Sequence, residues 1–394
     1  MHDLIMTINT VKQSLPPSII KIARPIHRHL GRLSRFFTWI IPTLFRRIKK
    51  VPDKERRLLV IYDLSSQPFS IGDILTAQEA ALVLRENEGI DLVDFALVYD
   101  PKNPAADKTS HGNITESNYI YHLSSILPAA QVNQHLGSYF VFNSHQQLRR
   151  FIGDNSDLYY VWPSAWQFAT REYLYYSIFN NLLYNYYKKN NTIPHLSCHA
   201  LFIEWARGFF RQHVIPDVPV SIQIRNNKNF GQHRNTRIEE WLKFFQYCEG
   251  RYPVKFVIVC ALSEIDDRLR QHGNVLLAKD FHTGLEQDLS LIQTSIFHMG
   301  ASSGMGQMAL FNSKPYLITN TDATPNLYKD MVHEEGFMRF FFAGPLQRFG
   351  IGLETTELLI TEFARIWEAV DVAAWKLWAN SKVAKTDGLL SWLR

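Results

Sequence analysis

Residues 295–320, SIFHMGASSGMGQMALFNSKPYLITN, constrain the fold of this chain more than any other stretch. They contain a short apolar strand, a turn of small residues over 300–304, a helical run over 305–311 and a second strand around Leu317. Strand, turn, helix and strand in this order make one α/β unit. The stretch therefore predicts a parallel sheet covered by helices.

The small-residue turn is also a candidate phosphate site. Ser302 or Ser303 can cap the helix that follows, and Gly304 and Gly306 let a ligand approach the backbone closely. A helix start with unpaired N–H groups and nearby hydroxyls is a natural seat for a phosphate. A plain turn between a strand and a helix has the same composition, so the turn alone leaves both interpretations open.

Strands and helices alternate along most of the chain. Apolar runs predict strands over 58–64, 93–99, 139–142, 158–161, 220–224, 256–260 and 275–277. Helical patterns cover 74–88, 173–187, 201–214, 235–248 (with Asn235 or Thr236 as its cap), 285–293 and 355–378. This order predicts an α/β fold of two Rossmann-like domains that face each other across a cleft. Ligands of such sheets bind at the carboxyl ends of the strands, so we expect the ligand to lie in that cleft.

The length and composition agree with two domains. The chain has 394 residues, of which 46% are hydrophobic and 20% charged, as in ordinary globular proteins. We divide it into an N-terminal arm over 1–50, a first Rossmann-like domain over 51–215, a second over 216–350 and C-terminal helices over 351–394. The second domain carries the small-residue turn, so we expect it to bind the phosphate-bearing ligand.

The N-terminal arm is basic and amphipathic. No Asp or Glu interrupts the Lys and Arg residues over 21–50, and Ile22, Ile26, Leu30 and Leu33 recur at helical spacing. Such a helix is typical of a membrane interface. We therefore expect a cytoplasmic protein that is peripheral on the inner face of the membrane, where the lipids are anionic. Packing on the protein's own body is the alternative. Nucleic acid is the weakest interpretation, and we expect none as a partner, because a basic arm alone gives only a nonspecific footprint.

The cysteines and histidines predict no metal centre. Cys198, Cys248 and Cys260 are widely spaced and form no CxxC pair, which is typical of a reduced, cytosolic protein. His195 and His199 are four residues apart, but no third ligand lies near them in the sequence. We therefore expect no bound metal.

Arg225 directly follows the strand expected over 220–224 and is a candidate ligand for a diphosphate. Its guanidinium group offers a fork of donors that suits phosphate oxygens. Arg225 and the turn that contains Ser302 each stand at the carboxyl end of an expected strand, where ligands of open α/β sheets bind. A surface ion pair is the alternative role of Arg225.

Two segments of the second domain resemble bacterial glycosyltransferases of the GT-B architecture, in particular their fucosyltransferase-like branch. Residues 218–227, VPVSIQIRNN, resemble the strand-plus-arginine motif of GDP-sugar-dependent fucosyltransferases. Residues 291–311, LIQTSIFHMGASSGMGQMALF, are similar to their late strand, turn and helix, and the resemblance covers about a third of the chain. Asn226 stands where the family usually has a second basic residue, and Gln223 stands where it usually has a His.

The resemblance implies a metal-independent transfer of a hexosyl or deoxyhexosyl group from a nucleoside diphosphate sugar, with no other cofactor. GDP is the nucleotide of the resembled branch, and the acceptor would be a glycan or a lipid-linked molecule in surface polysaccharide synthesis. Arg225 would neutralise charge on the leaving diphosphate, and Ser302, Ser303 and Gly304 would bind its phosphates.

The resemblance also implies a place for the nucleoside. Asp280 and Glu286 lie in the loop and helix start before the turn, where such enzymes often hold the ribose or the base. Ordinary helix capping and solvated surface charge are the alternative roles of these two carboxylates. The identities of the sugar and the base stay open at this point.

An inverting transfer would also need a general base from the first domain. Asp73, in the loop after the first expected strand, is the first candidate, and a helix N-cap is its alternative role. His111, in a polar loop, is the second candidate. The alternative function is a non-catalytic α/β binding or scaffold protein at the membrane surface. A different nucleotide-dependent α/β transferase, such as a kinase, is a weaker alternative, because the sequence contains no GxxxxGK[ST] motif.

Overall fold

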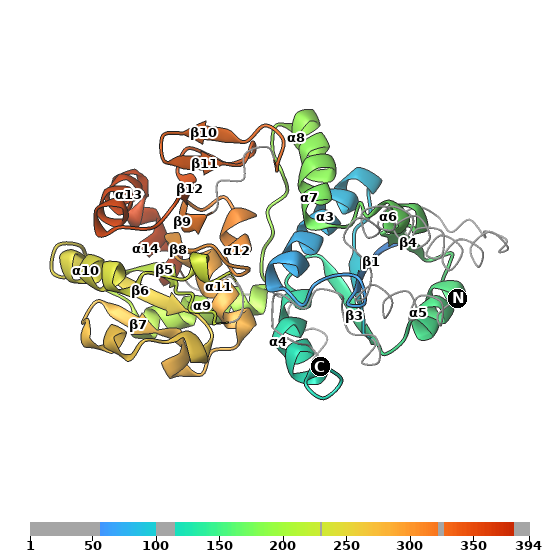
Figure 1. The fold of residues 1–394 in the computed structure, drawn as a ribbon, viewed down its shortest axis with the longest axis horizontal. Helices are drawn as coiled ribbons and strands as arrows, with labels where there is room; N and C mark the ends of the chain where they lie inside the picture. Colours follow the sequence, from blue (N-terminus) through green and yellow to red (C-terminus); the bar gives the residue numbers. More distant parts are fainter. Residues whose placement is uncertain (1–55, 100–114, 229–230, 322–326, 382–394) are drawn as a thin grey trace, which may run out of the picture.

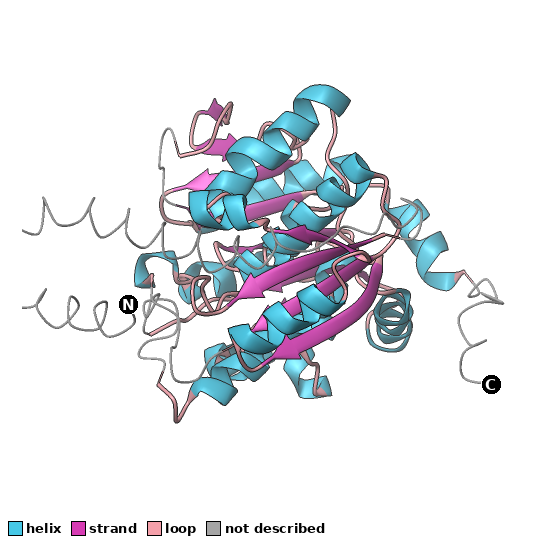
Figure 2. Cartoon of the chain, turned by 90° about the vertical axis from the view of Figure 1, so that its right-hand side faces the viewer, coloured by secondary structure: helices cyan, strands magenta, loops and turns pink. Residues whose placement is uncertain are grey.

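The computed structural model describes residues 56–99, 115–228, 231–321 and 327–381. The arm expected over 1–50 and the candidate base His111 lie outside the described residues. Within them, two sheets lie one after the other along the long axis of the molecule (Figure 1). Figure 2, seen from the side of the first sheet, shows helices around the strands.

The first sheet has four parallel strands in the order β3–β2–β1–β4. They are β1 (Arg57–Asp63), β2 (Val93–Val98), β3 (Leu136–Phe142) and β4 (Tyr159–Trp162). β1 and β2 are buried along nearly their whole length, because their apolar side chains are covered on both faces. Each lies within a few residues of its expected position.

The second sheet has eight strands in the order β10–β11–β12–β9–β8–β5–β6–β7. They are β5 (Val218–Gln223), β6 (Val254–Val259), β7 (Val275–Leu277), β8 (Phe297–Ala301), β9 (Tyr316–Thr321), β10 (Val332–Glu334), β11 (Phe337–Arg339) and β12 (Gln347–Ile351). The six strands from β12 to β7 are parallel, and their order is that of a Rossmann sheet. The expected fold of two Rossmann-like domains is therefore confirmed.

Helices cover the two sheets. Those of the first part are α3 (Ile71–Glu88), α4 (Tyr119–Ile126), α5 (His145–Asp154), α6 (Ala165–Thr170), α7 (Tyr175–Ser177) and α8 (Tyr184–Asn190), with the π-helical turn η3 (Ile178–Leu183) between the last two. Those of the second part are α9 (Ala200–His213), α10 (Ile238–Cys248), α11 (Leu285–Thr294), α12 (Gln307–Leu310), α13 (Thr356–Ala369) and α14 (Val372–Asn380).

Short 3₁₀ turns complete the connections. They are η2 (Leu127–Gln131), η4 (Gln232–Arg234), η5 (Leu262–Glu264), η6 (Asp267–Gln271) and η7 (Ala278–Phe281). The last four lie in the loops that connect the strands and helices of the second sheet.

The long helix α3 joins the two halves. Ser70 caps its start by accepting a hydrogen bond from the N–H of Asp73, and Gly89 ends it in the left-handed conformation with φ 64°. Residues from Gly72 to Leu84 are almost all buried, because α3 packs on β1, on η3 and on α12 of the second sheet. Its first turn therefore lies between the two domains.

An aromatic cluster also joins the halves. Phe179 of η3 stacks on Phe340, with ring centroids 4.6 Å apart, and its ring also lies 5.7 Å from that of Phe311 and 5.3 Å from that of Tyr328. Burial of large aromatic rings provides much of the energy of such contacts. This tyrosine-rich stretch, which was expected to be helical, thus packs as an interface between the two halves.

Three details differ from the sequence analysis. α9 packs on α11 and α14 of the second domain, although the division at 215 placed it in the first. The hairpin β10–β11 and the strand β12 were not expected, because strands of three and five residues give too short an apolar pattern. Arg237 rather than Asn235 or Thr236 is the N-cap of α10.

Candidate functional site

The candidate site lies where the order of the second sheet reverses, between β5 and β8. In open α/β sheets, ligands bind at the carboxyl ends of the strands at such a reversal point. Gln223 at the end of β5 is paired with Gly300 of β8. A Cβ atom on Gly300 would lie 2.6 Å from the carbonyl oxygen of Gln223, so only glycine allows the strands to approach this closely.

The turn after β8 presents backbone donors to this edge. The N–H of Ser302 donates to the Thr319 carbonyl of β9 at 2.9 Å, and the Ser303 hydroxyl donates to the Gln223 side chain. Among the described residues, none accepts a hydrogen bond from the N–H of Gly304 or Met305. Successive unpaired N–H groups in a turn form a concavity that suits an anion.

The helix after this turn is shorter than expected. α12 has four residues, and its N-cap is Gly306, so neither Ser302 nor Ser303 caps it. The N–H of Gln307 bonds to the Gly304 carbonyl, which makes the start a tight 3₁₀-like turn. The donors therefore come from the turn itself, and the helical run expected over 305–311 is only four residues long.

Arg225 shares the sheet edge with the turn but is engaged by its own loop. Its side chain is 6% exposed, and Nη1 donates to the Gly231 carbonyl at 2.7 Å and to Asn235 Oδ1 at 2.5 Å. Burial, with a smaller contribution from Arg234, lowers its pKa from the ordinary value. Arg225 thus fastens the loop after β5 to the sheet, and its role as a phosphate ligand stays a prediction.

Asp280 does not lie at the reversal point. It follows β7, the outer strand of the sheet, and its carboxylate pairs with Arg270 at 2.7 Å on the surface. β7 is separated from β5 by β6. The surface-charge alternative therefore describes Asp280 better than a nucleoside role in this conformation.

Glu286 lies in the first turn of α11, beside the buried carboxylate Asp288 that the sequence analysis missed. Asp288 Oδ2 lies 2.6 Å from Lys279 Nζ, and its Oδ1 accepts a hydrogen bond from the Thr283 hydroxyl at 2.6 Å. Burial raises the pKa of Asp288 to about 6, against the lowering effect of the Lys279 amine. Asp288 thus fixes the start of α11.

The first domain meets the turn through the start of α3. A Cβ atom on Gly304 would lie 2.7 Å from the N atom of Gly72, and one on Gly72 would lie 3.0 Å from the Cα atom of Gly304. Asp73 is the next residue along α3. It stands in the first turn of the helix and Ser70 is the cap, so the N-cap alternative for Asp73 is wrong.

Two half-buried phenols stand near Asp73. Burial is the largest cause that raises the pKa of Tyr175 and of Tyr328, and the charge of Asp73 raises both further. Tyr175 accepts a hydrogen bond from Gln307 Nε2 at 3.1 Å. Tyr175 belongs to α7 and Tyr328 follows β9, so the carboxylate is surrounded by groups from both domains. No local pattern predicts this cluster, because its members lie far apart along the chain.

A second polar cluster lies at the carboxyl end of β1. His145 Nε2 is 2.8 Å from Asp63 Oδ2, and the Ser65 hydroxyl donates to Asp63 Oδ1 at 2.7 Å. Ser65 Oγ and His145 Nε2 are 3.3 Å apart. This edge of the first sheet corresponds to the reversal point between β1 and β4. The sequence analysis missed it because His145 comes from a different helix, α5.

The described residues contain no group of three or more His, Cys, Asp or Glu side chains that could hold a metal ion. Cys198, Cys248 and Cys260 are buried and unpaired. Within the same part of the chain, no helix combines the length and the apolar character that crossing a membrane requires.

Comparisons with known proteins give distant structural neighbours but no relative in sequence. No protein-family model matches the chain, and no curated protein matches it in sequence. Among solved structures, it is similar to a family 9 glycosyl transferase from Veillonella parvula, with 10% identity over 80% of this chain and 91% of the other, and a TM-score of 0.48. It is also similar to the Escherichia coli ADP-heptose LPS heptosyltransferase II, with 12% identity over 79% and 99% and a TM-score of 0.45.

A third structure is the fucosyltransferase NodZ from Bradyrhizobium, with 10% identity over 66% of this chain and 94% of the other and a TM-score of 0.27. These neighbours are glycosyltransferases, which is the class that the sequence resemblance named. The fold assignment itself depends on the strand order described above, and the activity is argued below from the residues of this chain.

Proposed function

We propose that this chain is a glycosyltransferase that moves a sugar from a nucleoside diphosphate to a hydroxyl group of a glycan or lipid-linked acceptor. The observation that supports this most is the contact between Gly72 and Gly304, which sets a carboxylate of one Rossmann-like domain beside the phosphate-type turn of the other. The reversal points of both sheets bear polar groups, as expected when a donor and an acceptor bind opposite each other.

The reaction we propose is a single displacement. The pyrophosphate of the donor accepts hydrogen bonds from the turn at Gly304 and Met305, which stabilises the negative charge that develops as the bond to the anomeric carbon breaks. Asp73 accepts the proton of the acceptor hydroxyl, whose oxygen forms the new bond to that carbon. Attack opposite the leaving group inverts the configuration. Transfer without a metal, and GDP as the nucleotide, are parts of the proposal taken from the resemblance.

Nucleotide binding is the direct test. Calorimetric titration of the full chain with GDP, ADP, UDP and CMP should give binding by one of them, and Gly304→Val should abolish it by filling the turn. Gly208→Val in α9 is the control, because nothing lies within 4 Å of a Cβ atom there. If none of the nucleotides binds, the alternative of a non-catalytic binding or scaffold protein is the better one.

We also propose that residues 1–50 hold the enzyme on the cytoplasmic face of an anionic membrane. Each cation near such a surface contributes about 1 kcal/mol, and the arm carries a run of them without a single acid. Removing residues 1–50 should abolish sedimentation with anionic vesicles and leave nucleotide binding intact. Vesicles of neutral phosphatidylcholine are the control, and unchanged sedimentation of the shortened chain contradicts the proposal.

A further inference from the structure

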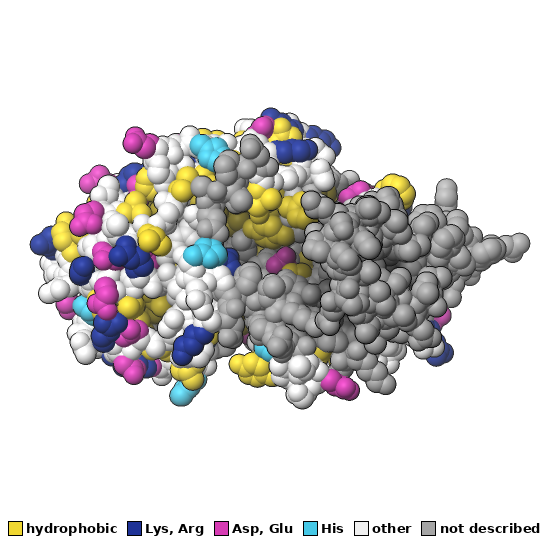
Figure 3. All heavy atoms as spheres, viewed as in Figure 1, with side chains coloured by type: hydrophobic (Ala, Val, Ile, Leu, Met, Phe, Trp, Pro, Cys, Tyr) yellow, Lys and Arg dark blue, Asp and Glu magenta, His cyan; other side chains and the backbone are white. Residues whose placement is uncertain are grey.

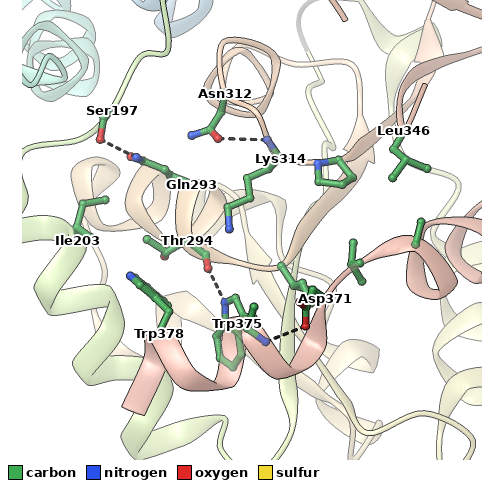
Figure 4. A pocket seen from close by; sticks show the side chains of 15 residues that line it. Ser197, Ile203, Gln293, Thr294, Asn312, Lys314, Leu346, Asp371, Trp375 and Trp378 are labelled. Carbon is green, nitrogen blue, oxygen red and sulfur yellow. Dashed lines mark hydrogen bonds between the residues drawn. The ribbon is translucent and has the colours of Figure 1, made fainter. Parts of the chain in front are cut away.

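A cavity of about 590 Å³ lies at the other edge of the second sheet, away from the turn. Ile296 and Pro315, which line it, directly precede β8 and β9, so the cavity lies at the amino ends of these strands. Trp375 and Trp378 of α14 close it from one side (Figure 4). The cavity is therefore separate from the candidate site, which lies at the carboxyl ends of the same strands.

Most polar groups in the wall already have partners within the protein. Gln293 donates to the Ser197 hydroxyl at 2.6 Å and accepts from the Cys198 N–H at 2.7 Å. The Trp375 indole donates to the Thr294 carbonyl at 2.9 Å, which fixes the ring in the wall. These contacts hold the cavity open in a defined shape without any ligand.

Lys314 is the exception. Figure 4 shows its side chain extending into the cavity toward Thr294 and Trp375. No described residue accepts a hydrogen bond from its amine or forms an ion pair with it. Burial lowers its pKa from the ordinary value. Lys314 is half-buried and its amine is open to the cavity, so an anion that enters the cavity gains a charge-assisted hydrogen bond there.

The backbone around Lys314 is fixed. Gln347 Nε2 donates to the carbonyls of Asn312 at 2.7 Å and of Lys314 at 2.9 Å, and the Lys314 N–H donates to Asn312 Oδ1 at 3.2 Å. Pro315 follows at once and restricts the chain further. The amine is thus presented from a rigid support, which lowers the entropic cost of binding.

We propose that this cavity is a binding site for a small organic anion, a carboxylate or phosphate group on a flat apolar body. The anionic group would pair with the Lys314 amine. The body would pack against Trp375, Trp378 and the aliphatic side chains of Ile203 and Leu346, which line the same space. Neither the nucleotide nor the acceptor of the proposed transfer is needed for this site.

Three matched probes test the charge requirement: 2-naphthoate, 2-naphthyl phosphate and neutral 2-naphthamide, titrated calorimetrically into the full chain. At least one anion should bind roughly tenfold more tightly than the amide, and Lys314→Met should remove that difference while leaving the amide unchanged. The tighter of the two anions identifies the group. Lys243→Met, at an exposed position of α10, is the control and should change nothing.

A second measurement needs no variant. Trace acetylation of the wild-type lysines, read by mass spectrometry, should be slowed at Lys314 by the bound anion and unchanged at Lys243. Equal affinity for anion and amide, no binding of either anion at millimolar concentration, or no protection of Lys314 overturns the proposal. Gly304→Val, which tests the transferase site, should leave anion binding intact, so the two proposals can fail separately.

Discussion

Gly72 and Gly304 meet so closely that neither has room for a side chain: a Cβ atom on Gly304 would lie 2.7 Å from the N atom of Gly72. Gly72 lies in the first turn of the helix that carries Asp73, and Gly304 belongs to the turn after β8. The two domains therefore contact each other through backbone at the point where we place the chemistry.

The first prediction concerns this contact. Gly304→Ala forces backbone apart on both sides and should lower the free energy of unfolding by roughly 1–3 kcal/mol. Urea denaturation measures the change. The control is Gly208→Ala in α9, where nothing lies within 4 Å of a new Cβ atom, and which should stabilise the protein by about 0.5–1 kcal/mol. Equal effects at the two sites contradict a tight contact between the domains.

The second prediction concerns Asp73. Asp73→Asn keeps the size of the side chain but cannot accept a proton, so turnover should fall by about 10²–10⁴-fold. Affinity for the nucleotide should stay as in the wild type. Release of nucleoside diphosphate from the nucleotide sugar, with calorimetry for binding, separates the two effects. Asp91→Asn, at an exposed position beyond α3, is the matched control. A variant with full turnover rules out Asp73 as the base.

The third prediction separates structure from binding at Arg225. Arg225→Ala removes the donor to Gly231 and Asn235 and should cost roughly 1–3 kcal/mol of stability, because two partly buried acceptors lose their hydrogen bonds to a buried guanidinium. Arg211→Ala on exposed α9 surface should change stability by less than about 0.5 kcal/mol. Chemical denaturation in the absence of nucleotide gives the comparison. An Arg225 variant as stable as the wild type would favour a ligand-binding role.

The fourth prediction follows from Glu79, which is fully buried in α3 with neither carboxylate oxygen hydrogen-bonded within the described structure. Burial raises its pKa well above the ordinary value of 4.5. The folded state then holds a proton that the unfolded chain releases, so this group's contribution to stability is complete below pH 4.5 and falls as the pH rises above it. Glu79→Gln should flatten that decline in urea titrations, whereas exposed Glu335→Gln should not.

The fifth prediction has the opposite sign. Burial lowers the pKa of His298 to about 3, although its Nδ1 lies 3.0 Å from the Ser221 hydroxyl. The unfolded chain therefore binds more protons between pH 3 and 6.5, and this histidine makes the protein less stable as the pH falls through that interval. His298→Gln should reduce the acid sensitivity. His282→Gln, at an exposed position, should leave the acid transition where it is.

Sequence patterns predicted the central strands because their apolar runs are local. β5, β6 and β8 lie within a few residues of the expected ranges, and β7 coincides with 275–277. The hairpin β10–β11 was missed, since strands of three residues have no readable period.

The site was predicted only in part. The turn that contains Ser302 and the candidate base Asp73 were both proposed from local motifs. In the structure both lie where the two domains meet. Two contacts could not be predicted from the sequence: that of Asp63 with His145 and that of Arg225 with Asn235. In both cases the partners approach each other only when the chain folds. The ion pair of Asp280 with Arg270 did not follow from the sequence either, because the two residues meet only after their loops have folded.

The ring of Phe179 has a mechanical consequence. It is held by Phe340, Phe311 and Tyr328, all from the half of the molecule that it does not itself belong to. Burial of this ring stabilises the join between the two halves independently of the backbone contact between Gly72 and Gly304. Loss of the ring should therefore weaken the hold of one half on the other and leave the core of each sheet intact.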